Sequence, residues 1–474
     1  MTGADSLNQP NAEASLEKDP TMTLDRSPTV RLGAGAGFAG DRIDPALDLA
    51  ERGGLDYLVF ECLGERTIAA AHARRLSSPG SGYDPRLLAR MRAVLPACRS
   101  AGTRIITNSG AAEPLAAGRA VVELARDLGL TGLRVAVLTG DDVLEAVRKT
   151  RPVDAETGEP LDLDAAVSAN AYLGAKGIAD ALGEGADVVI TGRVSDPALY
   201  LGPLMHEHGW SPEDVELLGR GTLVGHLLEC AGQLTGGYFA DPGTKPVPGL
   251  DRLGFPFADV DAQGEALFQK LPDTGGLLTP QTCAEQLLYE VDDPGAYLTP
   301  DVVADFSRVS FTTAGPDAVR AVGATGRARP SQLKVTLGYR GGWLGEGQIS
   351  YAGPRALERA RLAGEVARAR LHRVHGLPEE AVELEYIGTG AAFRGLADAP
   401  EALSEALPEV RLRVSARVDD EERAAAVPWE VESLYTNGPA GGGGARGSVT
   451  EQVSVRSCLL DRGLAPYTTT MLEA

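Results

Sequence analysis

Strand and helix patterns alternate along the chain from Thr29 to about Gly202, and this alternation limits the fold more than any other feature. Five short apolar runs are typical of strands: VRLGAG, LDYLVFE, RIITNSG, RVAVLTG and DVVITGR. The segments between them carry apolar residues three to four positions apart, as amphipathic helices do. This alternation predicts an α/β fold with an N-terminal doubly wound, mostly parallel, Rossmann-like sheet that helices cover on both faces.

The pattern changes beyond about residue 300. The stretch QLKVTLGYRGGWLGEGQISYAG predicts a hairpin, and PRALERARLAGEVARARLHRVHG predicts a long helix. Strands at AVELEYIG and EVRLRVSARV, a helical segment and a strand near EQVSVRSCL follow, which together predict a smaller α+β domain. We therefore predict a disordered tail over residues 1–28, an α/β domain over 29–300 and an α+β domain over 301–474.

The net charge of −21, from 45 Lys and Arg against 66 Asp and Glu, limits the partners of the chain. So acidic a surface repels phosphate backbones and anionic lipids, which argues against nucleic acid and membrane surfaces and favours a small-molecule ligand. The five cysteines never occur as C-x-x-C, and the first residues lack the basic and apolar segments of a signal peptide. We expect a cytoplasmic protein without a disulfide framework or a metal site, and self-association into a homo-oligomer stays open.

The stretch RLGAGAGFAGDR, residues 31–42, contains G-x-G-x-x-G, and the acid Glu61 ends the next apolar run. This spacing resembles a dinucleotide-binding turn, in which a helix begins inside the glycine motif. Here the predicted helix starts four residues after the last motif glycine, and Asp41 would oppose a phosphate, although Arg42 offsets part of that charge. A dinucleotide site and a purely structural turn stay open. A small-molecule site that uses Gly37, Asp41 and Arg42 is favoured.

Polar residues also follow the other predicted strands, at the sheet edge where α/β proteins bind ligands. Glu61 and Glu65 are close enough to act as an acid and a base, or simply to occupy the start of a helix. Asn108 follows RIIT and can bind a carbonyl or carboxylate. Arg193 and Asp196 follow VVIT, and we predict that Arg193 receives an anion. The alternative is an Arg193–Asp196 ion pair without a ligand role.

Two further segments carry candidate residues. If GHLLECAGQLTGGYFADPG is helical, His226, Glu229, Cys230 and Gln233 share one face, where the first three could act in catalysis and Gln233 could bind substrate. The alternative is a buried cysteine that packs as a small apolar residue and a hydrogen-bonded histidine. The stretch NGPAGGGGARG predicts a loop in which Arg446 wraps an anion, with a lid or a linker as alternatives.

Several long stretches, in order along the chain, resemble the acyclic terpene utilisation (AtuA) family. They are GAGAGFAGDR, LDYLVFECLGERT, ITNSGAAEP, VVITGRVSDPALYLGPL, GHLLECAGQLTGGYFADPG, LLYEVDDPGAYLTPDV and NGPAGGGGAR. The resemblance implies a role in bacterial breakdown of citronellol- and geraniol-type terpenoids through acyl-CoA intermediates, alongside a geranyl-CoA carboxylase. It implies no catalytic residue.

From these residues and the resemblance we expect an enzyme that acts on an acyl-CoA or a branched carboxylic acid by acid/base chemistry, as a lyase, hydratase or hydrolase. The strand-end groups supply the acid, the base and the carbonyl or carboxylate receptors. No resident cofactor is expected, and coenzyme A enters only as part of the substrate. Two alternatives stay open: a non-catalytic partner of an acyl-CoA carboxylase or another pathway enzyme, and a nicotinamide-dependent oxidoreductase that uses residues 33–61.

Overall fold

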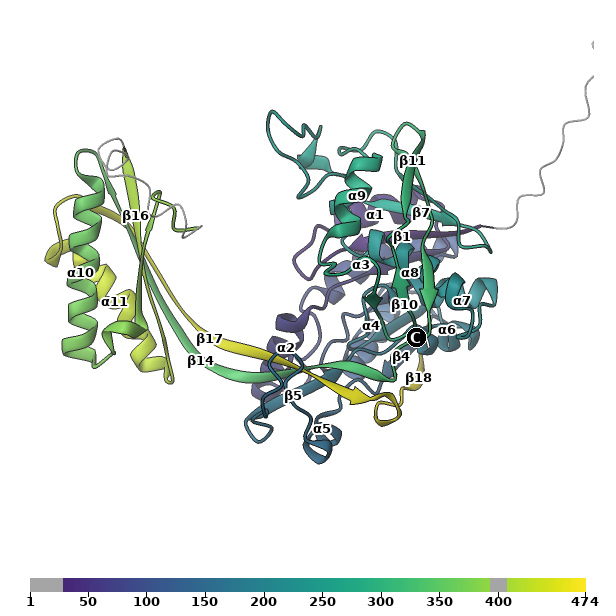
Figure 1. Cartoon of the computed structure of the whole chain (residues 1–474), viewed down its shortest axis with the longest axis horizontal. Helices are drawn as coiled ribbons and strands as arrows, with labels where there is room; N and C mark the ends of the chain where they lie inside the picture. The colour runs from purple at the N-terminus through teal and green to yellow at the C-terminus, as the bar shows by residue number, and fades with distance from the viewer. Residues whose placement is uncertain (1–28, 393–406) are drawn as a thin grey trace, which may run out of the picture.

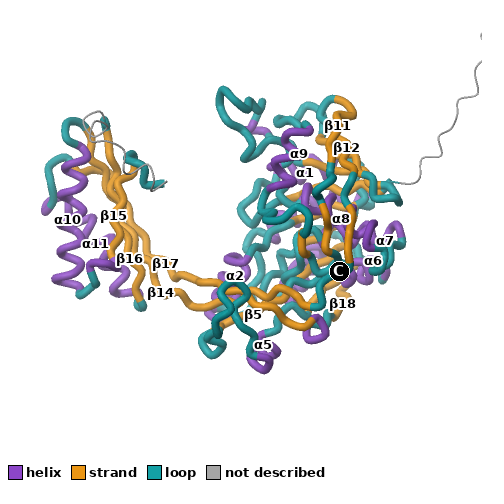
Figure 2. The backbone as a smooth tube through the Cα atoms, viewed as in Figure 1, coloured by secondary structure: helices purple, strands orange, loops and turns teal. Residues whose placement is uncertain are grey.

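A computed structural model describes residues 29–392 and 407–474, so the predicted tail over 1–28 lies outside the described residues. The chain forms a large body and a smaller lobe, and two long strands join them (Figure 1). Strands run through both parts and along the connection, as the colouring by secondary structure in Figure 2 makes clear. None of the helices within the described ranges has the length and apolar character needed to cross a bilayer.

A ten-stranded mixed sheet runs through the body. Its central strands pair in parallel in the order β1 (Val30–Ala36), β2 (Tyr57–Phe60), β3 (Arg104–Thr107), β6 (Val188–Thr191) and β4 (Arg134–Thr139). Antiparallel strands extend it on both sides: β7 (Pro256–Val260), β8 (Ala266–Lys270), β12 (Ala318–Val322) and β11 (Ser310–Gly315) beyond β1, and β18 (Thr468–Glu473) beyond β4. The α/β class is confirmed, but the sheet is mixed rather than mostly parallel. Short turns join β7 to β8 and β11 to β12, and such turns permit only antiparallel neighbours.

Two packed rows of helices cover the central strands. The first row is α1 (Asp44–Arg52), α3 (Leu87–Ala101) and α4 (Pro114–Asp127), and the second is α6 (Lys176–Gly183), α7 (Ala198–His208) and α8 (Val215–Leu228). Helices α2 (Glu65–Ser77), α5 (Leu144–Thr150) and α9 (Pro280–Leu288) lie outside these rows. Leu58, Val59 and Phe60 of β2 are fully buried, as expected for a central parallel strand covered on both faces.

The small lobe is built on a second sheet in the order β15 (Val382–Ile387), β16 (Glu409–Val418), β14 (Gln332–Ala352) and β17 (Gly442–Asp461). Helices α10 (Ala356–His375) and α11 (Glu421–Asn437) pack on it. Near the body, β14 also pairs with β5 (Ala166–Ala171). We call the paired stretch of β14 and β17 between body and lobe the arm.

The hairpin predicted over residues 332–353 is wrong, because β14 is one strand of 21 residues. The pair Gly341-Gly342, which resembles a turn, lies at a register shift between Arg340 and Trp343, and pairing with β17 continues on both sides of it. Gly342 has φ +75°, a conformation that glycine adopts without strain. The two glycines therefore make a bulge that bends the strand and does not reverse it. The loop predicted over 437–447 is likewise shorter, since Gly442 already belongs to β17.

The predicted division at residue 300 does not coincide with a change of sheet. Strands β11, β12 and β18 come from beyond that residue, yet they pair within the ten-stranded sheet. A small sheet of β9 (Tyr297–Leu298), β10 (Val303–Asp305) and β13 (Thr325–Arg327) lies between them in sequence. The lobe is therefore an excursion of the chain between β13 and β18.

Candidate functional site

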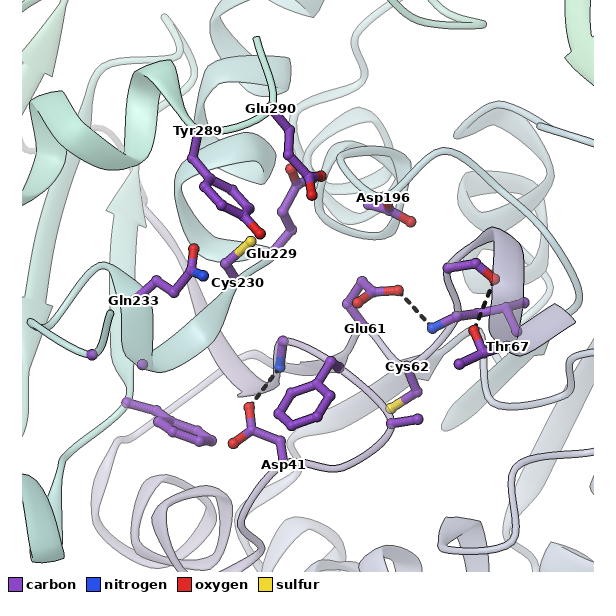
Figure 3. Close-up of a pocket in the computed structure, with 18 of the residues that line it drawn as sticks. Asp41, Glu61, Cys62, Thr67, Asp196, Glu229, Cys230, Gln233, Tyr289 and Glu290 are labelled. Atoms are coloured by element: carbon purple, nitrogen blue, oxygen red, sulfur yellow. Dashed lines mark hydrogen bonds between the residues drawn. The ribbon is translucent and has the colours of Figure 1, made fainter. Parts of the chain in front are cut away.

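Strand ends and helix ends converge on one cavity of about 620 Å³ (Figure 3). The turn after β1, the turn after β2, Asp196 after β6 and the segment after α8 all contribute to its wall. Nine of the residues predicted from sequence line it: Gly37, Asp41, Arg42, Glu61, Glu65, Asp196, Glu229, Cys230 and Gln233. The gathering of these polar segments at one edge is what a parallel sheet produces.

Glu61 comes directly after β2 and carries the most perturbed carboxyl group with a resolved value in the cavity wall. It is 8% exposed, and its side chain accepts hydrogen bonds from the backbone N–H of Leu63 (2.7 Å) and from Nδ2 of Asn108 (3.0 Å). Burial and then the negative charge of Asp196 raise the pKa of Glu61 to about 8, against the lowering effect of Arg193. Near neutral pH this carboxyl group can therefore donate a proton.

Asn108 does not line the cavity. Its Oδ1 accepts a hydrogen bond from the backbone N–H of Cys62 (2.7 Å), while its Nδ2 donates to Glu61. Both ends of the amide are thus engaged by the segment after β2. Asn108 therefore orients Glu61 from behind the cavity. The predicted contact of Asn108 with a carbonyl or carboxylate of a ligand is not part of this geometry.

Arg193 and Asp196 form an ion pair, with 2.9 Å between Nη2 and Oδ1. The guanidinium is 2% exposed and lies 4.1 Å from the ring centroid of Tyr172. Asp196 lines the cavity but Arg193 does not, so the predicted direct contact of Arg193 with an anion is not part of this geometry. Burial raises the pKa of Asp196 although the charge of Arg193 lowers it. The ion pair that the sequence left open as an alternative is present.

His226 lies behind the cavity wall and holds Glu229, which lines the cavity. Nδ1 of His226 is 3.0 Å from Oε1 of Glu229, and Nε2 is 3.0 Å from the carbonyl oxygen of Leu287. Because a carbonyl only accepts, Nε2 carries a proton and Nδ1 shares one with Glu229. Burial raises the pKa of Glu229 to about 7, and the hydrogen bond to Glu229 raises the pKa of His226 although burial opposes it.

The predicted helical face over residues 226–233 is interrupted. Helix α8 ends at Leu228, and Ala231 has φ 43°, which a continuing helix cannot accommodate. Cys230 and Gln233 still line the cavity, from the segment that follows. Burial raises the pKa of the Cys230 thiol well above its usual range, which disfavours the thiolate that a nucleophilic cysteine requires.

Glu65, whose side chain is 41% exposed, differs from the buried acids of the cavity. It accepts hydrogen bonds from the Tyr172 hydroxyl (2.6 Å) and from Nζ of Lys334 (3.1 Å). Burial alone would raise the pKa of Glu65, but these partners lower it to about 2. Glu65 is therefore ionised at neutral pH and does not pair with Glu61 as a second proton donor.

The glycine-rich turn packs against protein where a dinucleotide would need open space. An added Cβ at Gly37 would lie 2.7 Å from Cα of Cys230, and one at Gly35 would lie 2.7 Å from the ring of Phe60. The backbone N–H of Gly37, a donor that a pyrophosphate would need, binds Oδ2 of Asp41 at 2.9 Å instead. The glycines thus allow close packing and give the turn its place in the cavity wall.

Replacing Gly37 with Ala is expected to lower the free energy of unfolding by about 1–3 kcal/mol, because the new methyl group meets the Cys230 backbone. Gly315→Ala is the matched control, since a Cβ there finds its nearest neighbour at 3.7 Å, an ordinary contact. Chemical denaturation of both variants measures the difference. Equal stability of the two variants would contradict the packing role of Gly37.

Sequence reasoning gave no sign of the part of the cavity wall that comes from the end of α9. Tyr289 and Glu290 enter the wall from the end of α9, far along the chain from the parallel strands. The left-handed conformation of Glu290 (φ 58°) is unusual for a residue with a side chain, but no sequence pattern reveals it. One predicted residue lies elsewhere: Arg446 is on β17 in the small lobe, and its guanidinium donates to the carbonyl of Ala445.

The charge of the cavity wall is strongly one-sided. A single guanidinium faces six carboxyl groups, those of Asp41, Glu61, Glu65, Asp196, Glu229 and Glu290. The guanidinium, that of Arg42, already donates to the carbonyl of Leu250 at 2.8 Å. Across the described part of the chain, no three His, Cys, Asp or Glu side chains are arranged to hold a metal ion.

The fold defines an α/β protein with a large mixed sheet, whose strand ends place buried carboxyl groups of raised pKa in one cavity. Within that class the chain belongs to the acyclic terpene utilisation family, AtuA, whose family model matches residues 30–471. Membership points to acyclic terpene utilisation as the metabolic setting. No curated protein and no solved structure matches the chain.

Proposed function

We propose that the protein is an acid/base enzyme that adds water to, or removes it from, an acyclic terpenoid or branched acyl group held as a thioester. The observation that carries the proposal is the presence, in one cavity, of two buried carboxyl groups whose pKa values lie near neutrality, Glu61 at about 8 and Glu229 at about 7. Groups that titrate near the working pH are the most effective proton donors and acceptors.

The charge of the cavity favours a thioester over a free carboxylic acid. A carboxylate would enter a wall with six carboxyl groups, whereas the acyl end of a thioester is uncharged. The volume of about 620 Å³ lies within the range of small-molecule sites and accommodates a branched acyl chain. Of the two substrate types expected from sequence, the acyl-CoA type is therefore the one we propose.

In the hydration direction, Glu229 takes a proton from water as the oxygen bonds to the β-carbon of an α,β-unsaturated thioester. Protonated Glu61 donates its proton to the α-carbon, so that the double bond is consumed and no charge is left over. The hydrogen bond from Nδ1 of His226 orients Glu229 for this step. Each turnover leaves Glu229 protonated and Glu61 ionised, and exchange with water in the cavity returns both groups to their starting states. Dehydration follows the same steps in reverse.

A nicotinamide-dependent reaction has less support. The turn that resembled a dinucleotide site has its central amide bound by Asp41 and its central glycine covered by Cys230. A non-catalytic role as a partner of a carboxylase would leave the raised pKa values of Glu61 and Glu229 without a use. Acid/base catalysis uses both groups.

The proposal predicts a bell-shaped pH dependence of turnover with α,β-unsaturated thioesters of branched acids. Glu229 must be ionised, so the rate falls below about pH 7, and Glu61 must be protonated, so the rate falls above about pH 8. Loss of the conjugated double bond, followed by ultraviolet absorbance from pH 5 to 10, measures the profile. Mass spectrometry of the product from H₂¹⁸O verifies the origin of the hydroxyl. A rate that only rises with pH, or the absence of ¹⁸O in the product, would contradict it.

A further inference from the structure

A second cavity, of about 420 Å³, lies beside the first at the base of the arm. The two cavities share Gly64, Glu65 and Thr67, at the start of α2. The far wall of the second cavity comes from Lys334 of β14 and Arg456 of β17. Helix α2 packs on both of these strands, as Figure 1 also shows.

The two guanidinium groups of this second cavity are exposed and loosely held. Arg66 is exposed, and its side chain makes no hydrogen bond or ion pair within residues 29–392 and 407–474. The side chain of Arg456 is 67% exposed, and its nearest carboxylate oxygen, on Asp154, is 3.9 Å away. Lys334 is held by Glu65 at 3.1 Å. Two guanidinium groups can therefore turn toward a ligand.

Most of the carboxylates nearby already have partners. Asp154 accepts backbone N–H groups from Glu156 (2.9 Å) and Thr157 (3.0 Å), and Glu65 accepts from Tyr172 and Lys334. Glu156 also lines the cavity, and it is the exposed carboxylate that would oppose an anion there. The second cavity thus balances three cations, Arg66, Lys334 and Arg456, against three carboxylates, whereas the first cavity has six carboxyl groups and one guanidinium.

We infer that the second cavity binds the phosphate groups of the carrier part of the substrate, while the acyl end lies in the first cavity. The inference rests on the proposed function, since it assigns the two ends of one thioester to two adjoining cavities. Guanidinium groups bind phosphate oxygens in a bidentate manner, and on a strongly acidic protein an anionic carrier is held best where cations offset the carboxylates, as they do in the second cavity but not in the first. The base of the arm is then part of the substrate site.

Calorimetric titration with coenzyme A and with pantetheine, which lacks the phosphates, tests the inference. Coenzyme A is expected to bind at least tenfold more tightly than pantetheine. The double variant Arg66→Gln, Arg456→Gln is expected to weaken coenzyme A binding about tenfold or more, as the loss of charge-assisted hydrogen bonds implies. Glu156→Gln is expected to tighten it, and Arg92→Gln, an exposed arginine on α3 outside both cavities, serves as the control.

Equal affinities for coenzyme A and pantetheine, or unchanged coenzyme A affinity in the double variant, would overturn the inference. The proposed function is tested separately by wild-type turnover of an N-acetylcysteamine thioester, which carries no phosphate. If that thioester is turned over but coenzyme A binding does not depend on the two arginines, the proposed function is supported and the phosphate site is refuted. Arginine-dependent binding of coenzyme A without any thioester turnover would do the reverse.

Discussion

Replacing Arg193 with Leu is expected to lower the free energy of unfolding by about 3–5 kcal/mol. The guanidinium is 2% exposed, and it is the cation that faces the buried carboxyl group of Glu61 and that of Asp196, which is 32% exposed. Removal of this buried charge leaves the carboxyl groups that it faces uncompensated and an apolar side chain beside them, which accounts for a loss of this size. Urea denaturation at pH 8 measures it.

Arg99→Leu provides the matched control for this substitution. Arg99 pairs with Asp187 at 3.3 Å, but both side chains are about one third or more exposed, at 40% and 32%. Exposed pairs contribute little, so a loss of less than about 1 kcal/mol is expected. If the two variants lose the same stability, the charge of Arg193 is not required in the folded protein and its role as a counter-ion is refuted.

Replacing Glu61 with Gln is expected to reduce kcat for thioester hydration about 10²- to 10⁴-fold, the contribution of a positioned general acid. The amide keeps the size of the side chain and can still accept from Leu63, but it has no proton to donate to carbon. Steady-state kinetics at pH 7.5 measures the effect. Glu430→Gln is the control, because Glu430 is also buried but lies in the small lobe, on α11. A kcat close to wild type in the Glu61 variant would exclude Glu61 as the acid.

The same variant gives a readout that does not depend on activity. The folded-state pKa of Glu61, about 8, lies above its usual value of 4.5, so between these pH values the folded protein holds a proton that the unfolded chain releases. This group therefore makes stability fall as pH rises from about 5 to 8. The thermal midpoint of Glu61→Gln is expected to fall less over that range than the wild-type midpoint does. Parallel curves would mean that Glu61 is already ionised in the folded protein.

The central strands and the cavity could both be predicted from the sequence, because both follow from a parallel sheet that is buried on its two faces. Strands buried on both faces, such as Tyr57–Phe60, are continuous apolar runs, and the polar groups that follow them must gather at one sheet edge when the strands are parallel. Glu61, Asp196 and Asp41 were predicted on this basis, and they line one cavity. The partners of each side chain could not be predicted from the sequence, because the ion pair of Arg193 and the hydrogen bonds of Asn108 depend on side-chain directions.

The features of the fold and the cavity that could not be predicted depend on contacts between segments that are distant in sequence. The antiparallel strands β7, β8, β11 and β12 carry no local signal of the partner that they will find in the large sheet. The glycine pair in β14 has the composition of a turn, and only continued pairing with β17 makes it a bulge. Tyr289 and Glu290 reach the cavity because α9 ends there, which no periodicity in the sequence expresses.

The pairing of β18 with β4 has a consequence for the order in which the molecule is made. Thr468 pairs with Thr139, and 329 positions separate them along the chain. A ribosome adding about 5–20 residues per second needs roughly 15–65 s to travel that distance. Throughout this interval the outer edge of β4 has no strand beside it, and an unpaired edge is a template for wrong partners. The nascent chain therefore has to protect this edge, through chaperones or through delayed folding of the sheet, until residues 468–473 emerge.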